Sequence, residues 1–190
     1  MKKYYKNLKL LEKNYVYSKE MEHDACGVGL IASTEGKKSR QVVKYGIEAL
    51  KAVWHRGAVD ADGKTGDGAG IHVEIPKDFF IEKVEVTGHT YDNCEICVGM
   101  IFLPRNDYDA QESCKTIVES ELTKNNFNIF GWRQVPVNPK VLGVKAFQTM
   151  PEIIQVLFKS NDQNLLNKKL ERKIYETRRK IENKALNLSL

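Results

Sequence analysis

The run from Ile96 to Leu103 places the strongest constraint on the fold of this chain. Its residues, Ile-Cys-Val-Gly-Met-Ile-Phe-Leu, include no charged side chain, and Pro104 follows directly. A continuous apolar run of this length, closed by a proline, is typical of a β-strand that is buried on both faces. With 190 residues, 42% of them hydrophobic, the chain is long enough for one domain with a core around such a strand.

Alternating apolar residues predict two more strands in the first half of the chain, at 26–32 and at 71–75. Between them, Ser39 is expected to cap a helix that ends at His55-Arg56-Gly57 and buries the stripe Val43, Ile47, Leu50 and Trp54. Residues 57–70 include five glycines and three aspartates, which predicts a loop.

The second half of the chain alternates in the same way between helical and extended patterns. Asp107 or Asp109 is expected to cap a helix of about 15 residues. Strands are predicted at 127–137 and 152–158, and a final helix at roughly 164–184. One side of the helix after Asp107 carries Cys114, Ile117, Val118 and Leu122.

Cys26 opens an apolar run directly behind a charged leader that ends His23-Asp24-Ala25. A cut between Ala25 and Cys26 would place a thiol and a new α-amino group on one residue at the tip of the predicted first strand. The pKa of a free thiol is about 8.5 and that of an α-amino group about 7.7–8.0, so the neutral amine is able to accept the thiol proton. This pattern indicates an N-terminal nucleophile, with residues 1–25 as a leader or propeptide.

Charge and hydropathy exclude several classes of protein. The net charge of +5 arises at the ends, because residues 1–20 carry six Lys against two Glu and residues 168–184 carry eight Lys or Arg against three Glu. The remaining middle is acidic, which argues against nucleic acid as a partner. The sequence has no stretch of ~18–20 apolar residues and no apolar signal segment, which argues against a membrane or secreted protein.

The other cysteines and the histidines have plain structural interpretations. Without export signals, the four cysteines are expected to be reduced thiols in a cytoplasmic compartment. Cys94 and Cys97 form a Cys-x-x-Cys pair, but a zinc site needs four ligands and no second pair follows, so no metal site is expected. His55 is expected at a helix C-terminus, and His72 on a sheet face.

Several segments, taken together and in order, resemble one known family. They are Cys26-Gly27-Val28-Gly29 and residues 46–57, 61–70, 98–105, 131–137 and 170–183. Their sequences are similar to the start of the large subunit of glutamate synthase, which is a class II glutamine amidotransferase domain. The similarity extends from about Glu22 to Asn183.

The resemblance implies an α+β fold, specifically an αββα four-layer sandwich of the N-terminal-nucleophile hydrolase type. It also implies that a cysteine thiolate attacks the side-chain amide of glutamine, releases ammonia and leaves a γ-glutamyl thioester that water hydrolyses. The ammonia would then serve glutamate synthesis at a second site. FMN and an iron–sulfur cluster would lie in the rest of a full-length enzyme, with no cofactor in this chain. The implied partners are glutamine, the remainder of the large subunit and a small electron-donating subunit.

The resemblance carries over to individual residues at three places. Cys26 matches the nucleophile, and Arg56, in His-Arg-Gly, matches an arginine close to the nucleophile. The loop 65–70 matches a glycine-rich stretch near the same pocket, so Gly66, Asp67 and Gly68 are expected to support the substrate pocket. Glycines there would let backbone amides approach a ligand.

The resemblance stops before the domain of the family does. The family places the oxyanion-hole asparagine and glycine, and the groups that clamp glutamine, beyond the position of Asn183. Residues 26–190 are therefore expected to form the N-terminal part of a class II glutamine amidotransferase domain, with a fold that is incomplete at its C-terminal side. The isolated chain is expected to be weak or inactive, since the loss of one oxyanion donor typically costs about 10²- to 10³-fold in turnover. The alternative is a truncated, inactive amidotransferase-like module that acts as a binding or assembly partner.

Overall fold

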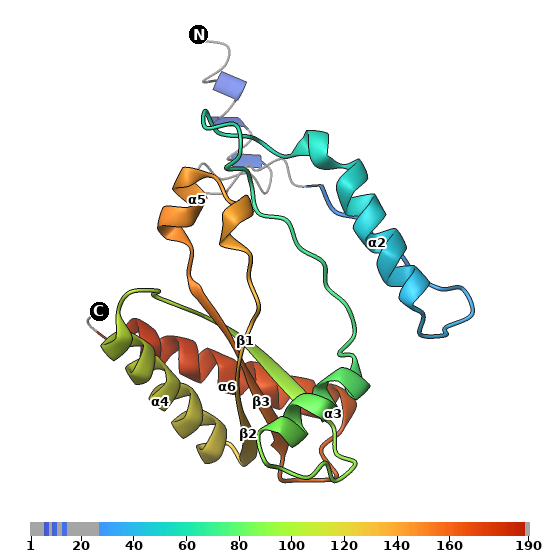
Figure 1. The fold of residues 1–190 in the computed structure, drawn as a ribbon, viewed down its shortest axis with the longest axis vertical. Helices are drawn as coiled ribbons and strands as arrows, with labels where there is room; N and C mark the ends of the chain where they lie inside the picture. The colour runs from blue at the N-terminus through green and yellow to red at the C-terminus, as the bar shows by residue number, and fades with distance from the viewer. Residues whose placement is uncertain (1–5, 8, 11–12, 15–26, 189–190) are drawn as a thin grey trace. The chain divides into compact units, whose positions relative to one another are not determined.

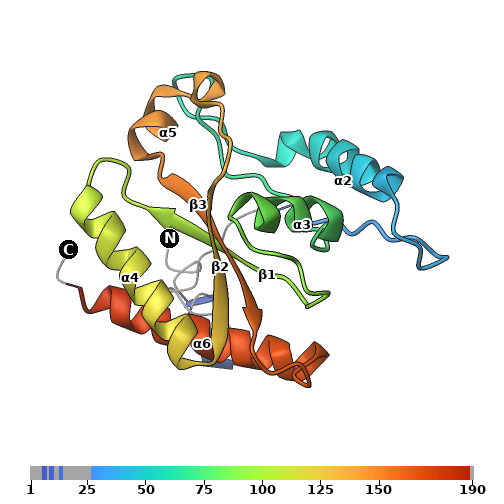
Figure 2. The same cartoon turned by 60° about the horizontal axis from the view of Figure 1, so that its bottom comes forward.

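The computed structural model describes residues 6–7, 9–10, 13–14 and 27–188. The chain divides into two compact units. The first comprises residues 1–60 and 66–71, and the second comprises residues 61–65 and 72–190. Figures 1 and 2 show the helices and strands of both units. The two units differ in how their apolar residues are packed.

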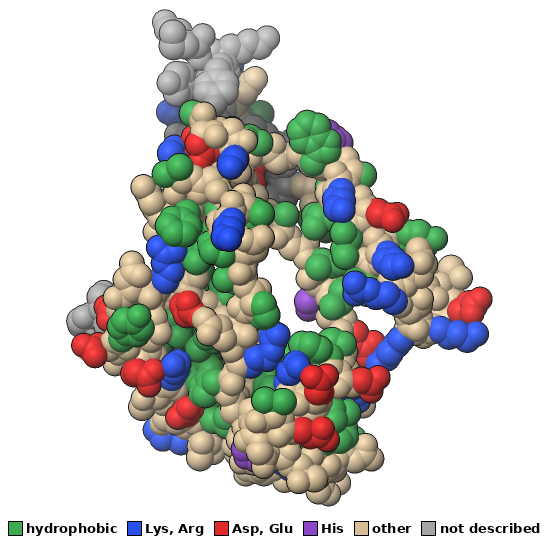
Figure 3. All heavy atoms as spheres, in the orientation of Figure 1, with side chains coloured by type: hydrophobic (Ala, Val, Ile, Leu, Met, Phe, Trp, Pro, Cys, Tyr) green, Lys and Arg blue, Asp and Glu red, His purple; other side chains and the backbone are tan. Residues whose placement is uncertain are grey.

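The first unit contains helix α2 (Arg40–Ala52) and the short 3-10 helix η1 (Trp54–Arg56). The predicted cap is confirmed, because Ser39 Oγ accepts a hydrogen bond of 3.1 Å from the backbone N–H of Gln41. The predicted burial of the apolar stripe is wrong. No residue of α2 is buried and Trp54 is 76% exposed, since the described part of this unit provides no layer for the stripe to pack against. Figure 3 shows hydrophobic side chains at the surface along α2.

The strands predicted at 26–32 and 71–75 are not found in the described chain. Residues 27–33 and 67–76 have no regular secondary structure, and Val28 is 96% exposed. An alternating pattern makes a strand only where the backbone N–H and C=O groups find a partner strand. In this part of the described chain, Val59 and Gly66 form an isolated antiparallel β-bridge.

The second unit contains a three-stranded antiparallel sheet of β1 (Cys97–Leu103), β2 (Phe127–Gln134) and β3 (Glu152–Ser160). The strand order is β1-β3-β2, so the last strand in sequence lies in the centre. Two register pairs, Gly99 with Val156 and Ile129 with Phe158, fix the alignment of the outer strands on β3. The three strands predicted in this region are therefore confirmed, with β2 three residues shorter than expected.

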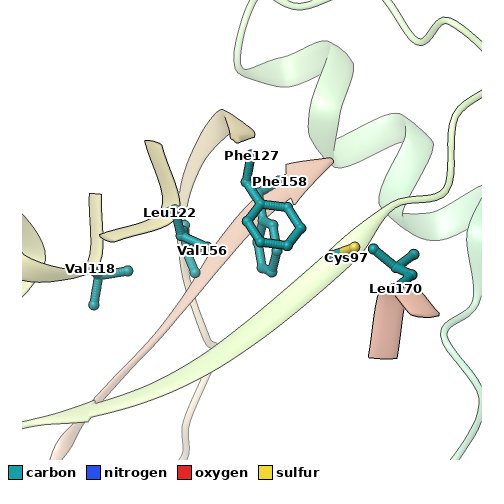
Figure 4. Packing of buried hydrophobic residues seen from close by; sticks show 7 residues of the cluster. All are labelled: Cys97, Val118, Leu122, Phe127, Val156, Phe158 and Leu170. Carbon is teal, nitrogen blue, oxygen red and sulfur yellow. The ribbon is translucent and has the colours of Figure 1, made fainter. Parts of the chain in front are cut away.

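Helices α4 (Tyr108–Lys124) and α6 (Asn167–Leu186) cover one face of this sheet (Figures 1 and 2). Both helices were predicted, and the Asp107 carboxylate caps α4 by accepting a hydrogen bond of 2.9 Å from Ala110 N–H. The buried cluster between helices and sheet is drawn in Figure 4 and consists of Cys97, Val118, Leu122, Phe127, Val156, Phe158 and Leu170. Basic and acidic side chains are interspersed on the outer surface over α4 (Figure 3).

The opposite face of the sheet is only partly covered, by helix α3 (Lys77–Val86). Phe80 and Val84 of α3 pack with Leu157, which is 0% exposed. Further along the same face of β1, Met100 is 49% and Phe102 is 64% exposed. The prediction that β1 is buried on both faces therefore holds at its start and is wrong at its end.

The connection from β2 to β3 contains two short helices that the sequence patterns did not predict. They are the 3-10 helix η2 (Pro139–Val141) and helix α5 (Val144–Thr149). Asn138 caps η2 through its side-chain oxygen, which accepts from Lys140 N–H at 3.3 Å. Gly143 is the N-cap of α5 and has no side chain to offer as a cap. Helix α5 leads through Met150 and Pro151 into the central strand.

Candidate functional site

The predicted nucleophile, Cys26, and the leader in front of it lie outside the described residues apart from three short stretches of the leader. The first described residues after Cys26 are Gly27, Val28 and Gly29, and all three are exposed. The position of the thiol and the boundary at 25/26 therefore stay predictions.

Arg56 is the last residue of η1, directly after the exposed His55. The structure describes the backbone of Arg56 and not its side chain. The turn closes through Gly57, whose N–H donates to the carbonyl of Trp54 at 3.0 Å. The sequence thus predicted the end of this helical segment correctly, while the relation of the guanidinium group to a substrate pocket stays a prediction.

The glycine-rich loop is closed at its base by Ala58 and Asp67. The Asp67 carboxylate accepts from Ala58 N–H at 2.9 Å, and Asp67 N–H donates to the Ala58 carbonyl at 3.2 Å. A Cβ atom on Gly66 would lie 3.0 Å from the Ala58 carbonyl oxygen, so a glycine at this position lets the backbone come close to Ala58. A Cβ on Gly68 would meet nothing within 4 Å. Asp67 therefore has a structural task, and of the two glycines only Gly66 is held by close packing.

In the second unit, the turn 61–65 is organised by the Asp62 carboxylate. Asp62 Oδ1 accepts from the N–H groups of Lys64 at 2.9 Å and Thr65 at 2.7 Å, and Oδ2 accepts from the Thr65 hydroxyl at 2.6 Å. It also accepts from the N–H of Val144, and together these donors hold the pKa of Asp62 far below its usual range. Sequence reasoning did not single out Asp62, although its spacing to Lys64 and Thr65 is that of a turn-forming aspartate.

The Cys-x-x-Cys pair does not form a joint site. Cys97 belongs to the cluster under α4 and α6, whereas Cys94 packs with the cluster under α3, so their thiols lie on opposite faces of the sheet. Burial raises the pKa of Cys94 to about 11 and that of Cys97 to about 12, with the nearby carboxylates of Asp92 and Glu95 acting in the same direction. Neither thiol is therefore a reactive thiolate near neutral pH. Within residues 27–188 and the short described stretches before them, no group of three or more His, Cys, Asp or Glu residues is arranged to hold a metal ion.

A hollow of about 320 Å³ lies at the end of β1. Its lining comes from residues 102–106 and 148–151. The guanidinium carbon of Arg105 lies 4.6 Å from the ring centre of Phe147, and buried Gln111 donates to the carbonyls of Pro104 and Arg105. None of the site residues predicted from sequence lines this hollow. His72 was expected on a sheet face, but it is exposed and lies in the irregular segment before α3.

In the described part of the chain, no helix is both long enough and apolar enough to cross a membrane.

Comparison with known proteins identifies the family of the chain. Residues 26–189 match the family of class-II glutamine amidotransferases, so the match begins at Cys26 and continues beyond Asn183, where the sequence resemblance was expected to end. The chain is 54% identical over 166 residues to the glutamate synthase [NADPH] large chain of Azospirillum brasilense, which covers 87% of this chain. It is 39% identical over 175 residues to the ferredoxin-dependent glutamate synthase of Pyropia yezoensis, covering 92%. It is 34% identical over 168 residues to the glutamate synthase [NADPH] large chain of Bacillus subtilis, covering 88%.

The matched region spans 11% of the length of each of these three relatives. The likeness therefore concerns one domain of much longer proteins. It is strong over that domain, since most of this chain aligns with each relative. By the match of residues 26–189 and by these identities, the chain belongs to the class-II glutamine amidotransferases.

Proposed function

We propose that this chain carries out the glutamine-hydrolysing step of a glutamate synthase, with Cys26 as the nucleophile. The observation that carries the proposal is that the family match begins at Cys26, the residue that a cut after Ala25 would make N-terminal. The identity of 54% over 166 residues to a glutamate synthase large chain supports the assignment of the ammonia to glutamate synthesis.

The chemistry needs only the groups of one residue to begin. The neutral α-amine of Cys26 takes the thiol proton, and the thiolate attacks the side-chain carbonyl carbon of glutamine. The C–N bond breaks, ammonia leaves with a proton from the ammonium group, and a γ-glutamyl thioester remains on the sulfur. Water then attacks the thioester, which releases glutamate and regenerates the thiol. Arg56 and the loop of Gly66, Asp67 and Gly68 are proposed to support the pocket around this reaction.

The proposed fold is the four-layer αββα sandwich of N-terminal-nucleophile hydrolases. One sheet already has helices α4 and α6 on one face. Its other face exposes Met100 and Phe102, two apolar side chains that a second sheet would cover. A sandwich buries such a face because apolar area removed from water stabilises by about 25 cal/mol per Å².

The remaining machinery is proposed to lie in other parts of a longer enzyme. Cys94 and Cys97 lie on opposite faces of the sheet and so do not fit a shared iron–sulfur cluster. The cluster, FMN and a small electron-donating subunit are assigned to the rest of the assembly. Cys94, Cys97 and Cys114 are free thiols, which supports a reducing, cytoplasmic compartment.

The test uses protein isolated from its own cells with an antibody against residues 26–70. We expect its N-terminus to be Cys26, and we expect a diazoketone analogue of glutamine to modify Cys26 with loss of ammonia release from glutamine. The Cys26→Ala variant should lose both labelling and ammonia release. Cys114→Ala is the matched control, because Cys114 is a half-buried thiol of α4 and should leave both unchanged. Retention of Met1 together with an unlabelled Cys26 would instead favour the non-catalytic assembly module.

A further inference from the structure

A short antiparallel ladder in the first unit joins the segment after Arg56 to the glycine-rich stretch. Val59 and Gly66 form an antiparallel bridge, and beside it Asp67 N–H donates to the Ala58 carbonyl at 3.2 Å. All of these residues belong to the first unit. The two segments to which the proposed function gives roles therefore lie side by side within one unit.

The side chain of Asp67 completes this ladder. In a hydrogen-bonded pair of an antiparallel ladder, each residue donates its N–H to the carbonyl of the other. Here backbone groups make the bond from Asp67 to Ala58, but the return bond from Ala58 N–H is accepted by Asp67 Oδ2 at 2.9 Å. The carboxylate therefore takes the place of a backbone acceptor.

The backbone that carries Arg56 is held by hydrogen bonds of its own turn and of the ladder. Gly57 N–H donates to the Trp54 carbonyl at 3.0 Å and closes the turn in which Arg56 lies. Two residues after Arg56, Ala58 is held by the ladder. A Cβ atom on Gly66 would lie 3.0 Å from the Ala58 carbonyl oxygen, so the ladder closes this tightly because that position has no side chain.

We propose that Asp67 is a positioning residue, whose carboxylate holds Ala58 and thereby sets the position of the backbone that carries Arg56. The inference rests on the proposed function, in which Arg56 and the glycine-rich stretch support the glutamine pocket. An aspartate in such a loop has two possible tasks. A carboxylate that binds the α-ammonium group of glutamine acts by its charge, whereas one that accepts from a backbone N–H acts through its oxygen. The hydrogen bond to Ala58 points to the second task.

The first test compares substitutions of Asp67 in protein isolated from its own cells. Asp67→Ala removes charge and acceptor, whereas Asp67→Asn removes the charge and keeps an acceptor oxygen. Asp67→Ala should speed hydrogen exchange of the Ala58 amide by about tenfold, the effect of one lost hydrogen bond, as measured by mass spectrometry of a peptide that contains it. It should also lower kinact/KI for the diazoketone analogue, and kcat/KM for glutamine, by about tenfold. Asp67→Asn should restore all three to within about threefold of wild type.

The second test asks whether Asp67 acts through Arg56. Arg56→Ala alone should lower kcat/KM, because it removes the group that is being positioned. Adding Asp67→Ala to Arg56→Ala should then change kcat/KM by less than about twofold, since residues that act as one unit are not additive. A carboxylate that only stabilised the fold would lower kcat/KM by the same factor in both backgrounds.

Glu48→Ala is the matched control, because it removes an exposed carboxylate from helix α2 of the same unit. It should leave exchange at Ala58 and both kinetic constants unchanged. If Asp67→Ala fails to fold, Asp67→Glu takes its place. The longer side chain keeps the charge and displaces the carboxylate, so it should lower kcat/KM although the charge is retained.

Each contrary result has a distinct meaning. Unchanged exchange at Ala58 in Asp67→Ala overturns the ladder as the means of positioning. Equal losses of kcat/KM in Asp67→Asn and Asp67→Ala overturn the positioning role in favour of direct binding of glutamine. Equal losses from Asp67→Ala with and without Arg56 overturn the action through Arg56. A wild-type protein that the analogue does not label overturns the proposed function and the positioning role together, while exchange at Ala58 still reports whether the ladder exists.

Discussion

The two units of the chain have similar proportions of hydrophobic residues, but among the described residues these are buried only in the second. In the second unit, two clusters of buried side chains lie on the two faces of the sheet, and Val84 and Leu157 are 0% exposed. In the first unit no described residue is buried, although α2 is capped and amphipathic. The difference shows that local patterns suffice to form a helix, whereas burial needs a covering layer. The predicted site residues Cys26, Arg56 and 66–68 belong to the first unit, whose described part lacks such a layer.

The largest effect is expected for Leu157→Ala, at the centre of the covered sheet. Leu157 contacts the α3 cluster and is 0% exposed, so truncation should leave a cavity and lower the unfolding free energy by about 2–5 kcal/mol. Urea unfolding monitored by circular dichroism measures this loss of unfolding free energy. Tyr45→Ala on α2, where Tyr45 is 51% exposed, should change stability by less than about 0.5 kcal/mol. A comparable loss at both positions would contradict the contrast between the units.

Two glycines provide the next comparison. A Cβ on Gly99 of β1 would lie 2.7 Å from Val156 Cγ1 in the core, so Gly99→Ala should destabilise the protein by about 1–3 kcal/mol. A Cβ on Gly29 in the first unit would meet nothing within 4 Å. Thermal melting should therefore separate the two alanine variants. Equal melting temperatures would show that β1 yields more readily than its packing indicates.

Both units contain a helix with a side-chain cap, which allows the same chemistry to be compared. Removing the cap by Ser39→Ala or Asp107→Ala should cost about 0.5–2 kcal/mol of helix stability. For Asp107→Ala the loss should appear in global unfolding, since α4 is part of the core. For Ser39→Ala it should appear as faster amide exchange within α2 alone. A global effect of Ser39→Ala would mean that α2 is packed more firmly than its exposure indicates.

The smallest expected effect concerns ion pairs and is measured as the pH dependence of the unfolding free energy. Glu121 of α4 is 4% exposed and pairs with Lys184 of α6, whose proton-donating ammonium group holds the pKa of Glu121 below its usual value. A lowered folded-state pKa adds stability that is fully present above the unfolded pKa and is lost as the pH falls through the folded value. Denaturant titrations from neutral to acid pH should therefore show a steeper loss for wild type than for Glu121→Gln.

The control for this pH effect lies in the first unit. Glu35 and Lys37 form a pair whose side chains are 69% and 81% exposed. Solvent screens such a pair, so Glu35→Gln should leave the acid dependence of stability unchanged. If Glu121→Gln also leaves it unchanged, the pair between α4 and α6 contributes nothing to the fold.

The sequence predicted elements well where the same pattern that forms an element also buries it. The run Ile96–Leu103, the cap at Asp107 and the final helix were predicted within a few residues of β1, α4 and α6. Helix α3 was not predicted, because only Phe80 and Val84 of its ten residues are buried and charged residues separate them. A helix with so small an apolar face is specified by the sheet it covers rather than by its own period.

Less of the site could be predicted, for a different physical reason. The closing of the glycine-rich loop by Asp67 and Ala58 involves neighbours nine positions apart, and the glycines gave a sufficient signal for a loop. The hydrogen bond from Ala146 N–H to Thr65 Oγ1 joins residues 81 positions apart, and no local pattern connects them. Only the sterics at Gly143 show why that position has no side chain. The strand predicted after Cys26 is wrong for residues 27–32, since alternation does not supply a pairing partner.

The strand order has a consequence for synthesis on the ribosome. The strand β3, which lies between β1 and β2, is the last of the three to be translated. Until it has left the exit tunnel, β1 and β2 lack the strand with which each pairs in the described sheet, and their apolar faces stay open to other nascent chains. The three-stranded sheet is therefore completed only after β3 has been translated. Mutations that delay β3 should act on the yield of folded protein more than on its final stability.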